Sequence, residues 1–585
     1  MSRGRARGTA AAIAAGLLLL TACTGVPSSS APQTVEPLPG GAVQSEQSIR
    51  PTVDASANEI VTEFLRANAV DPGNHASARS FLTADARTSW NDYNVTVISK
   101  ETLGTYQASN QSLTVHGQLV GTLDKNGIYT PALGGDGTGG APVSFKLTLA
   151  QTDDGQFRIA SLRPGLLLTD EQFAENYRQH SLYFYDNAQQ YLVQDPRYSD
   201  LDDRTQLSEW LLARLAAGPR PDLANAVTSN TLPTQADPSR ITVSVSTVTK
   251  VEIPGSSQLD ASGRDHLAAQ LSHTLDDPLS GGDITITDGG RPVRIPQTGS
   301  TQFAPTDFEA ELGAATPTPD VYYLAGGRIV DDAGKPVSGP LGRPGYNLSS
   351  MVLSESANGG PILAAGVQGS GSRAALLVGT LNSGLRAVGL SGRLTRPAFA
   401  PDRDEVWIGS GTKIFRATID SAAVHLDQVP VSQAQGTDRV LALRVSPDGA
   451  RIAVVMAPPN SGGGTLYVGS IVRGSGPVRI DALAPISPQK ALITDVAWLN
   501  PLRLFAIGRL AGSLDSDSLT FDSGVDGTDW SSQLVGLAER PDAVTVTAGA
   551  SAWVSAGGYV WVQSAGQWVS PTGGQTAGTA PIYLE

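Results

Sequence analysis

The stretch Val445-Ser446-Pro447-Asp448-Gly449 decides the fold, because similar turns recur at regular intervals along the second half of this chain. Phe399-Ala400-Pro401-Asp402 lies 46 residues before it, and Leu353-Ser354 lies 46 residues earlier again. Trp498-Leu499-Asn500-Pro501 follows it by 53 residues. An apolar strand comes after each turn, such as Arg451-Ile452-Ala453-Val454-Val455. A period of about 46 residues with three to four short strands per unit predicts a β-propeller.

The propeller is expected to occupy residues 315–585, where helical periodicity nearly vanishes and short apolar runs alternate with Gly, Ser and Asp turns. At the observed period this length accommodates about six blades. Asp320–Val330 and the last strands of the chain are expected to share one blade and so close the ring. A pair of β-sandwiches is the alternative architecture, but sandwiches do not require a repeated Pro-Asp turn at fixed spacing.

Two small α+β domains are expected before the propeller, the first over residues 51–165. Ile60, Val61, Phe64 and Leu65 form one apolar face of a helix, and Thr83 is placed to cap a short helix that ends near Trp90. Strict alternation over Val143–Leu149, a turn and a second apolar run predict a β-hairpin. At the level of fold analogy, helices followed by a curved antiparallel sheet look like the NTF2-like arrangement.

The second α+β domain is expected over residues 170–300. Ser181–Tyr185 and Ile241–Val245 read as strands, while Leu207–Leu215 and Arg264–Leu275 read as helices. Gly218-Pro219 ends the first of these helices, since Gly suits a C-cap and Pro cannot continue a helix. A proline-rich stretch then separates this domain from the propeller.

The N-terminus predicts an exported, lipid-anchored protein. A basic start is followed by an apolar run of about 11 residues, too short to span a bilayer but suited to a signal peptide. Leu20-Thr21-Ala22-Cys23 resembles a lipobox, so residues 1–22 are expected to be a signal peptide cleaved between Ala22 and Cys23. Cys23, the only cysteine, would carry N-palmitoyl and S-diacylglycerol groups; an incidental cysteine behind a different cleavage site is the alternative.

Residues 23–50 are rich in Pro, Ser and Gly and are expected to be a flexible tether, with an ordered arm as the alternative. The chain has a net charge of −14. An acidic surface repels phosphate backbones, so nucleic-acid binding is not expected, and attachment to the cell membrane on its extracytoplasmic face would come from the acyl chains.

We assign no catalytic, cofactor-binding or metal-ligating residue from the sequence. Gly369-Ser370-Gly371-Ser372 lacks the spacing of a nucleophile elbow. The six histidines are scattered, and each is expected to be solvated or locally bonded; His266 and His273 lie about 10 Å apart on one predicted helix, too far for one metal without other ligands. The acidic stretch Asp515–Asp522 departs from a calcium loop at Leu519 and is read as an acidic blade loop.

Two further features each allow two interpretations. The Pro401-Asp402 and Pro447-Asp448-Gly449 tips could be functional loops, but β-turns in which Asp bonds its own backbone are favoured. The tryptophans of the last blade could form a ligand platform or could pack between blades. These are Trp553, Trp561 and Trp568.

The order of these segments resembles the LpqB lipoprotein family of actinobacteria over essentially the whole chain. Phe64-Leu65-Arg66-Ala67 and Ala78–Thr83 look like its N-terminal domain. Tyr183-Phe184-Tyr185 and Leu215–Pro219 look like a GerMN domain. The individual motifs are short and unspecific, so the resemblance rests mainly on the order of the segments along the chain.

Because the sequence shows no catalytic pattern, the chain is not expected to be an enzyme. The resemblance implies that it binds the extracytoplasmic sensor domain of the MtrB histidine kinase. It would thereby modulate MtrA–MtrB two-component signalling in cell-envelope homeostasis and division. An envelope enzyme or glycan-binding protein acting on peptidoglycan remains the alternative; carboxylates or a histidine converging in the propeller channel would favour it.

Overall fold

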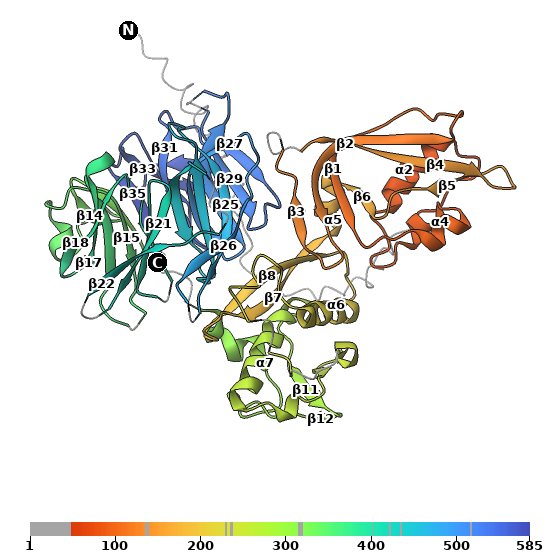
Figure 1. The fold of residues 1–585 in the computed structure, drawn as a ribbon, viewed down its shortest axis with the longest axis horizontal. Helices are drawn as coiled ribbons and strands as arrows, with labels where there is room; N and C mark the ends of the chain where they lie inside the picture. The colour runs from red at the N-terminus through yellow and green to blue at the C-terminus, as the bar shows by residue number, and fades with distance from the viewer. Residues whose placement is uncertain are drawn as a thin grey trace, which may run out of the picture. The chain divides into compact units, whose positions relative to one another are not determined.

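The computed structural model describes residues 48–134, 140–228, 231–233, 238–313, 320–357, 359–401, 403–420, 423–432, 436–474, 476–514 and 517–585. The predicted signal peptide, Cys23 and most of the predicted tether lie outside these residues. Described residues from Ser48 onward form one compact unit, which contains a first α+β domain, a second α+β domain and a propeller (Figure 1).

The propeller contains, in the described residues, one three-stranded and five four-stranded antiparallel sheets, which confirms the expectation of about six blades. The first blade consists of β35 (Thr579–Tyr583), β13 (Val321–Ala325) and β14 (Arg328–Asp331). The other blades are β15–β18 (Leu348–Ser354, Leu363–Gln368, Ala374–Thr380, Gly384–Gly392), β19–β22 (Ala398–Ala400, Glu405–Ser410, Lys413–Ile419, Val424–Val429), β23–β26 (Arg439–Val445, Arg451–Ala457, Thr465–Val472, Arg479–Pro485), β27–β30 (Ala491–Asn500, Arg503–Leu510, Leu519–Gly524, Ser531–Leu534) and β31–β34 (Pro541–Thr545, Trp553–Ala556, Tyr559–Ser564, Gln567–Val569).

The recurring turn found in the sequence joins the first strand of a blade to the second. β23 ends at Val445 and β19 ends at Ala400, so the interval of about 46 residues is the length of one blade. The first strands β15, β19, β23, β27, β31 and β35 contact one another in ring order. The final strand β35 pairs with β13, and the ring therefore closes through the shared blade that the sequence predicted.

The first domain packs four described helices against a bent sheet in the order β5-β4-β2-β1-β6, with β3 paired to β2. Ser56 caps α2 and Thr83 caps α4, and the apolar face of α2 is buried as expected. The elements are α2 (Ala57–Ala67), α3 (Ala76–Ser80), α4 (Ala84–Ser89), β1 (Val95–Leu103), β2 (Ser112–Leu123), β3 (Tyr129–Pro131), β4 (Pro142–Gln151), β5 (Phe157–Ser161), β6 (Leu166–Thr169) and α5 (Asp170–Asn176).

The second domain combines a two-stranded sheet, a four-stranded sheet in the order β12-β11-β10-β9, and two long helices. Its strands are β7 (Arg178–Tyr185), β8 (Leu192–Ser199), β9 (Thr242–Ser244), β10 (Thr249–Glu252), β11 (Ile284–Asp288) and β12 (Arg291–Pro292). Its helices are α6 (Arg204–Ala217), α7 (Ala261–Thr274) and α8 (Asp276–Leu279), with 3-10 turns at Pro238–Arg240, Ser256–Gln258 and Pro305–Leu312.

Both boundaries of this domain lie further along the chain in the structure than the predicted range of 170–300. β6 pairs in parallel with β1, and Phe173 of α5 is buried in the first core, so the first domain continues past residue 165 to about residue 176. Phe303 and Phe308 are buried in the second core, so that domain extends past residue 300 to about residue 312. The apolar run before Thr169 and the capping box at Thr169 are the sequence features that could have predicted the extension of the first domain.

We predict that Ile582→Ala lowers the free energy of unfolding by about 2–5 kcal/mol, because it opens a cavity where β35 closes the ring. Ile582 is 1% exposed and packs in the core shared by the first blades. Urea denaturation of the purified chain measures the effect. Val569→Ala, at a position that is 39% exposed, is the control and should change stability by less than about 0.5 kcal/mol. Equal midpoints for the two variants would contradict closure through β35.

Candidate interaction site at the domain junction

Strand β8 lies where the three domains meet, and no pattern in the sequence predicted it. Leu192–Ser199 pairs with β7 along its whole length. The run contains Pro196 between Asp195 and Arg197, a pattern typical of a loop. Pro is nevertheless tolerated in this two-stranded sheet, where each strand has an unpaired edge. Asp195 is fully buried, and Arg197 is 2% exposed.

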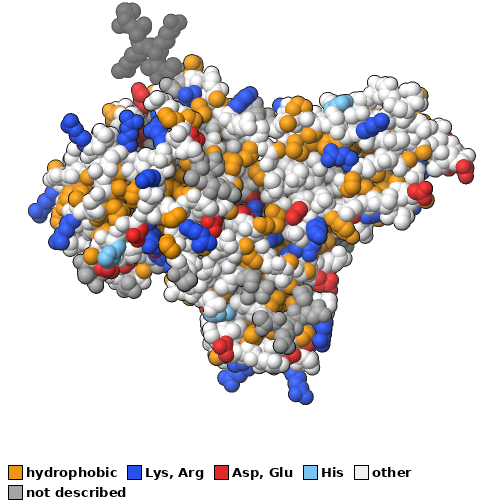
Figure 2. Space-filling view, viewed as in Figure 1, with side chains coloured by type: hydrophobic (Ala, Val, Ile, Leu, Met, Phe, Trp, Pro, Cys, Tyr) orange, Lys and Arg blue, Asp and Glu red, His pale blue; other side chains and the backbone are white. Residues whose placement is uncertain are grey.

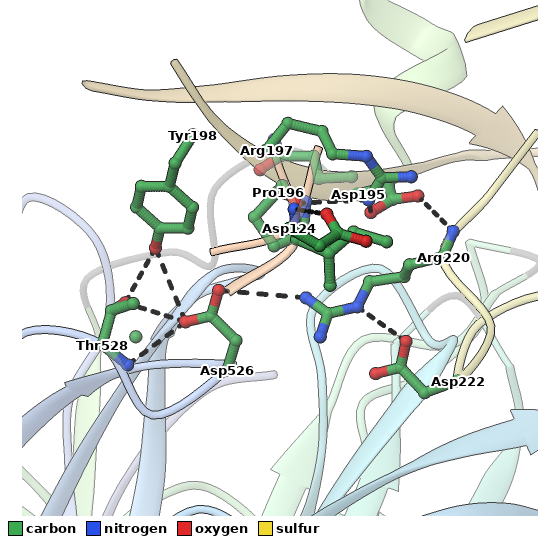
Figure 3. A network of polar contacts seen from close by, with 12 residues as sticks. Asp124, Asp195, Pro196, Arg197, Tyr198, Arg220, Asp222, Asp526 and Thr528 are labelled. Atoms are coloured by element: carbon green, nitrogen blue, oxygen red, sulfur yellow. Dashed lines mark hydrogen bonds and ion pairs between the residues drawn. The ribbon is translucent and has the colours of Figure 1, made fainter. Parts of the chain in front are cut away.

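Tyr198 connects the first domain to the propeller. Its ring lies 6.0 Å from the rings of Tyr129 and Phe173, both in the first core. Its hydroxyl oxygen lies 2.8 Å from Thr528 Oγ1 and 3.5 Å from Asp526 Oδ1, in the propeller turn between β29 and β30 (Figure 3). The Tyr198 side chain therefore packs its ring in the core of the first domain and places its hydroxyl group against the propeller.

The charges of β8 are neutralised by groups from the same junction (Figure 3). Asp195 forms an ion pair with Arg197 and accepts a hydrogen bond from the backbone N–H of Arg220 at 2.8 Å. The Arg220 guanidinium donates to Asp222 at 2.6 Å and lies 3.8 Å from Asp526 Oδ2. Burial raises the pKa of Asp195, and the two arginines oppose that rise. The junction is thus a buried network of alternating charges that crosses from the second domain to the propeller.

The recurring propeller turns contact the second domain as well. Gly449 N–H donates to Ser446 C=O at 2.8 Å, and Asp448 accepts from Ala450 N–H at 3.1 Å, which confirms the favoured β-turn interpretation. Asp448 also holds Arg451 at 3.0 Å, and Arg451 donates to the Gln194 carbonyl of β8. After the preceding turn, Arg403 pairs with Asp186 at 2.7 Å. These turns therefore connect strands within each blade and also bring residues of the propeller into contact with the second domain. Asp402 lies outside the described residues.

His75 joins the first domain to the end of β8, and the expectation of a solvated or locally bonded histidine is wrong here. It is buried, with its two ring nitrogens each 3.3 Å from a carboxylate, those of Asp92 and Asp200. Arg79 also pairs with Asp92, at 2.6 Å. Burial alone would lower the pKa of His75, but the hydrogen bonds and charges of Asp200 and Asp92 raise it to about 9. His75 is therefore a cation at neutral pH.

Five charged residues meet where the innermost strands of the propeller contact one another. They are Arg396, Arg444, Asp495, Asp542 and Glu585. Asp495 pairs with Arg444 at 3.1 Å, lies 3.6 Å from Arg396, and accepts from Val544 N–H at 3.0 Å. Glu585 accepts from Phe399 N–H at 3.1 Å. Burial raises the pKa of Asp542 and of Glu585, while burial and the neighbouring Arg444 lower the pKa of Arg396 to about 10.

The remaining sequence candidates do not come together. Within the described residues, no group of three or more His, Cys, Asp or Glu side chains is placed to hold a metal ion. His273 lies 3.1 Å from the Phe308 carbonyl, while the His266 ring lies against Tyr185. Asp515 lies outside the described residues, and Asp522 belongs to β29 and pairs with Arg503, so it is not part of an acidic loop.

The three tryptophans of the last blade pack between blades. Trp553 is buried against residues of the first blade, including Val321 and Tyr323. Trp561 and Trp568 are half-buried against the core that β27, β28 and β31 share. Inter-blade packing therefore accounts for all three, as one of the two interpretations expected.

Comparison with known proteins identifies the family. Residues 50–174 match the model of the lipoprotein LpqB N-terminal domain, and residues 327–583 match that of the lipoprotein LpqB beta-propeller domain. Lipoprotein LpqB of Mycobacterium tuberculosis (strain CDC 1551 / Oshkosh) is 31% identical over 465 residues, covering 75% of this chain and 76% of that protein. The chain belongs to the LpqB lipoprotein family.

LpqB of Mycolicibacterium smegmatis is 30% identical over 463 residues, covering 75% of this chain and 76% of that protein. Among solved structures, TolB from Acinetobacter baumannii covers 48% of this chain and 70% of its own, with 14% identity and a TM-score of 0.29. Residues 175–326 of this LpqB-family chain lie between the two matched regions. Among its described helices, none combines the length and apolar character needed to cross a membrane.

We predict that His75 makes stability depend on pH. Its pKa rises from an ordinary value near 6.5 to about 9 on folding. The contribution of protonated His75 to the free energy of unfolding, on the order of 3 kcal/mol, is therefore fully present below pH 6.5 and is lost as pH rises through 9. Urea denaturation at several pH values should show a gap between the parent protein and His75→Gln that narrows between pH 7 and pH 10. His425→Gln, at an exposed site, is the control; a pH-independent gap at His75 would contradict this account.

Proposed function

We propose that this LpqB-family chain is a lipid-anchored extracytoplasmic accessory protein. It binds the sensor domain of an MtrB-type histidine kinase and thereby modulates MtrA–MtrB signalling. Family membership is the observation that carries this proposal, since both family models match on either side of the central domain. The buried charge network of the junction supports it, because domains held as one body can present a fixed surface to a partner.

An envelope enzyme or glycan-binding protein acting on peptidoglycan is the second candidate. The carboxylates Asp495, Asp542 and Glu585 at the propeller centre favour it, since paired carboxylates are the groups that glycoside hydrolysis uses. Their partners argue for a structural role instead. Asp495 is bound by Arg444 and by Val544 N–H, and Glu585 by Phe399 N–H, so each of these contacts joins two different blades. Hydrolysis of peptidoglycan fragments that is lost in Asp542→Asn would favour the enzyme.

We propose that Cys23 carries the lipid anchor, with cleavage after Ala22. The described residues begin at Ser48, and the interval between Cys23 and that point is rich in Pro and Ser, as in a tether. A single acyl chain gives only marginal membrane binding, so more than one chain is expected on this cysteine. An acidic protein gains no attraction from anionic lipids, and the acyl chains would supply the attachment.

We predict that Cys23→Ser moves the protein from the membrane fraction to soluble fractions, or leaves it unprocessed with its signal peptide uncut. Mass spectrometry of the N-terminal peptide and fractionation of cells measure both outcomes. Thr21→Ser, beside the same cleavage site, is the control and should remain acylated and membrane-bound. Membrane retention of Cys23→Ser after its signal peptide has been removed would contradict the proposal.

We predict that purified residues 48–585 bind the kinase sensor domain directly, with an affinity that falls as salt rises. Figure 2 shows acidic, basic and hydrophobic side chains interspersed over the described residues of this face, so specific local sites rather than one large patch would carry the attraction. Calorimetry at two salt concentrations measures the effect. An absence of heat at high micromolar concentrations would remove the direct-partner proposal.

A further inference from the structure

A cavity of about 350 Å³ lies between the first domain and the propeller, beside the junction. Strands β1 to β3 and helix α5 form one wall, and the loop before β27 and the turn after β29 form the other. The backbone N–H of Gln489 donates to the Leu133 carbonyl at 3.0 Å across this seam. A volume of this size, at a contact between domains, is typical of sites that bind small groups.

The wall of this cavity is apolar and aromatic for most of its extent. Val97, Val120, Pro131, Phe173, Ile486 and Trp530 are among its lining residues. The Trp530 ring lies 5.3 Å from the ring of Phe521, which is buried in a blade core, so packing fixes its orientation. A wall of this kind suits the alkyl stem of a long side chain, and an aromatic ring attracts a cation.

The charged groups of the cavity are all acidic. Asp170, Glu171 and Asp529 line it, and no Lys, Arg or His is among the described residues that do so. Asp529 is partly neutralised by Arg503 at 3.4 Å. By contrast, no described basic side chain forms an ion pair with Asp170 or Glu171. Burial and the hydrogen bond and charge of the adjacent Glu171 raise the pKa of Asp170, whereas the same hydrogen bond and backbone N–H groups lower the pKa of Glu171.

We propose that this cavity binds a cationic side chain, that of an arginine or lysine carried on a segment of a partner protein. The alkyl stem would lie along the apolar wall, and the charged head would pair with Asp170 and Glu171. Charge complementarity selects this occupant: three acidic residues line the cavity, and its described lining includes no basic residue.

The test uses residues 48–585 and the peptide acetyl-Gly-Leu-Arg-Leu-Gly-amide, with binding followed by ligand-detected NMR. The matched peptide replaces arginine by citrulline, which keeps the shape and removes the charge. We expect the arginine peptide to bind at least about fivefold more tightly than the citrulline peptide, since charge-assisted hydrogen bonds are the stronger kind. This comparison needs no variant protein. Equal binding of the two peptides would overturn the proposal.

The site is located by the double variant Asp170→Asn with Glu171→Gln. The capping box of Thr169 and Gln172 at the start of α5 remains in it. Binding of the arginine peptide should fall at least about fivefold in this variant. The control, Asp332→Asn with Glu209→Gln, makes the same change in net charge at exposed positions outside the cavity and should change binding less than about twofold. Equal losses in both variants would overturn the assignment to this cavity.

Binding of free acetyl-arginine amide tests whether the cavity prefers an arginine carried on a protein segment to a free small molecule. The amide should bind more weakly than the peptide, because it lacks the apolar neighbours that the wall would contact. Equal affinity would overturn the assignment to a protein segment. If the double variant loses the arginine peptide but still binds the kinase sensor domain unchanged, the cavity serves a different partner, and the proposed kinase binding stands independently.

Discussion

The arrangement of the domains depends on strand β8, which buries an ion pair and a tyrosine where the domains meet. Asp195 and Arg197 are both almost inaccessible, and a buried charge left without a partner is strongly unfavourable. The backbone N–H of Arg220 helps to satisfy Asp195, and the side chain of Arg220 extends to Asp526 of the propeller. The contact between the Arg220 side chain and Asp526 exists only while the second domain and the propeller remain docked.

This constraint limits where a partner can bind. The turns between the first and second strands of two neighbouring blades are already engaged, through Arg403 with Asp186 and Arg451 with Gln194. Gly527 approaches the first domain so closely that a Cβ atom there would lie 2.9 Å from the Pro131 side chain. In these blades the turns therefore make contacts within the chain, and the proposed partner segment would bind a surface that remains open, such as the acidic cavity beside them.

The sequence predicted elements whose cause is local or periodic. The blade period follows from the turns after Val445 and Ala400, and the short helix after Thr83 follows from its cap. β8 could not be predicted in this way, because Pro196 and its charged neighbours suit a buried strand only when groups distant in sequence, such as Arg220 N–H, satisfy those charges. The role of His75 was missed for a similar reason, since its partner Asp200 is distant in sequence and nothing local marks the contact.

A double-mutant cycle between Tyr198 and Thr528 tests most directly whether β8 holds the domains as one body. The two hydroxyl oxygens lie 2.8 Å apart and belong to different domains. Tyr198→Phe, Thr528→Val and the combined variant would be compared by urea denaturation of residues 48–585. The account predicts a coupling energy of about 0.5–1.5 kcal/mol, as for a hydrogen bond between groups in contact. Additive effects, with a coupling below about 0.3 kcal/mol, would contradict it.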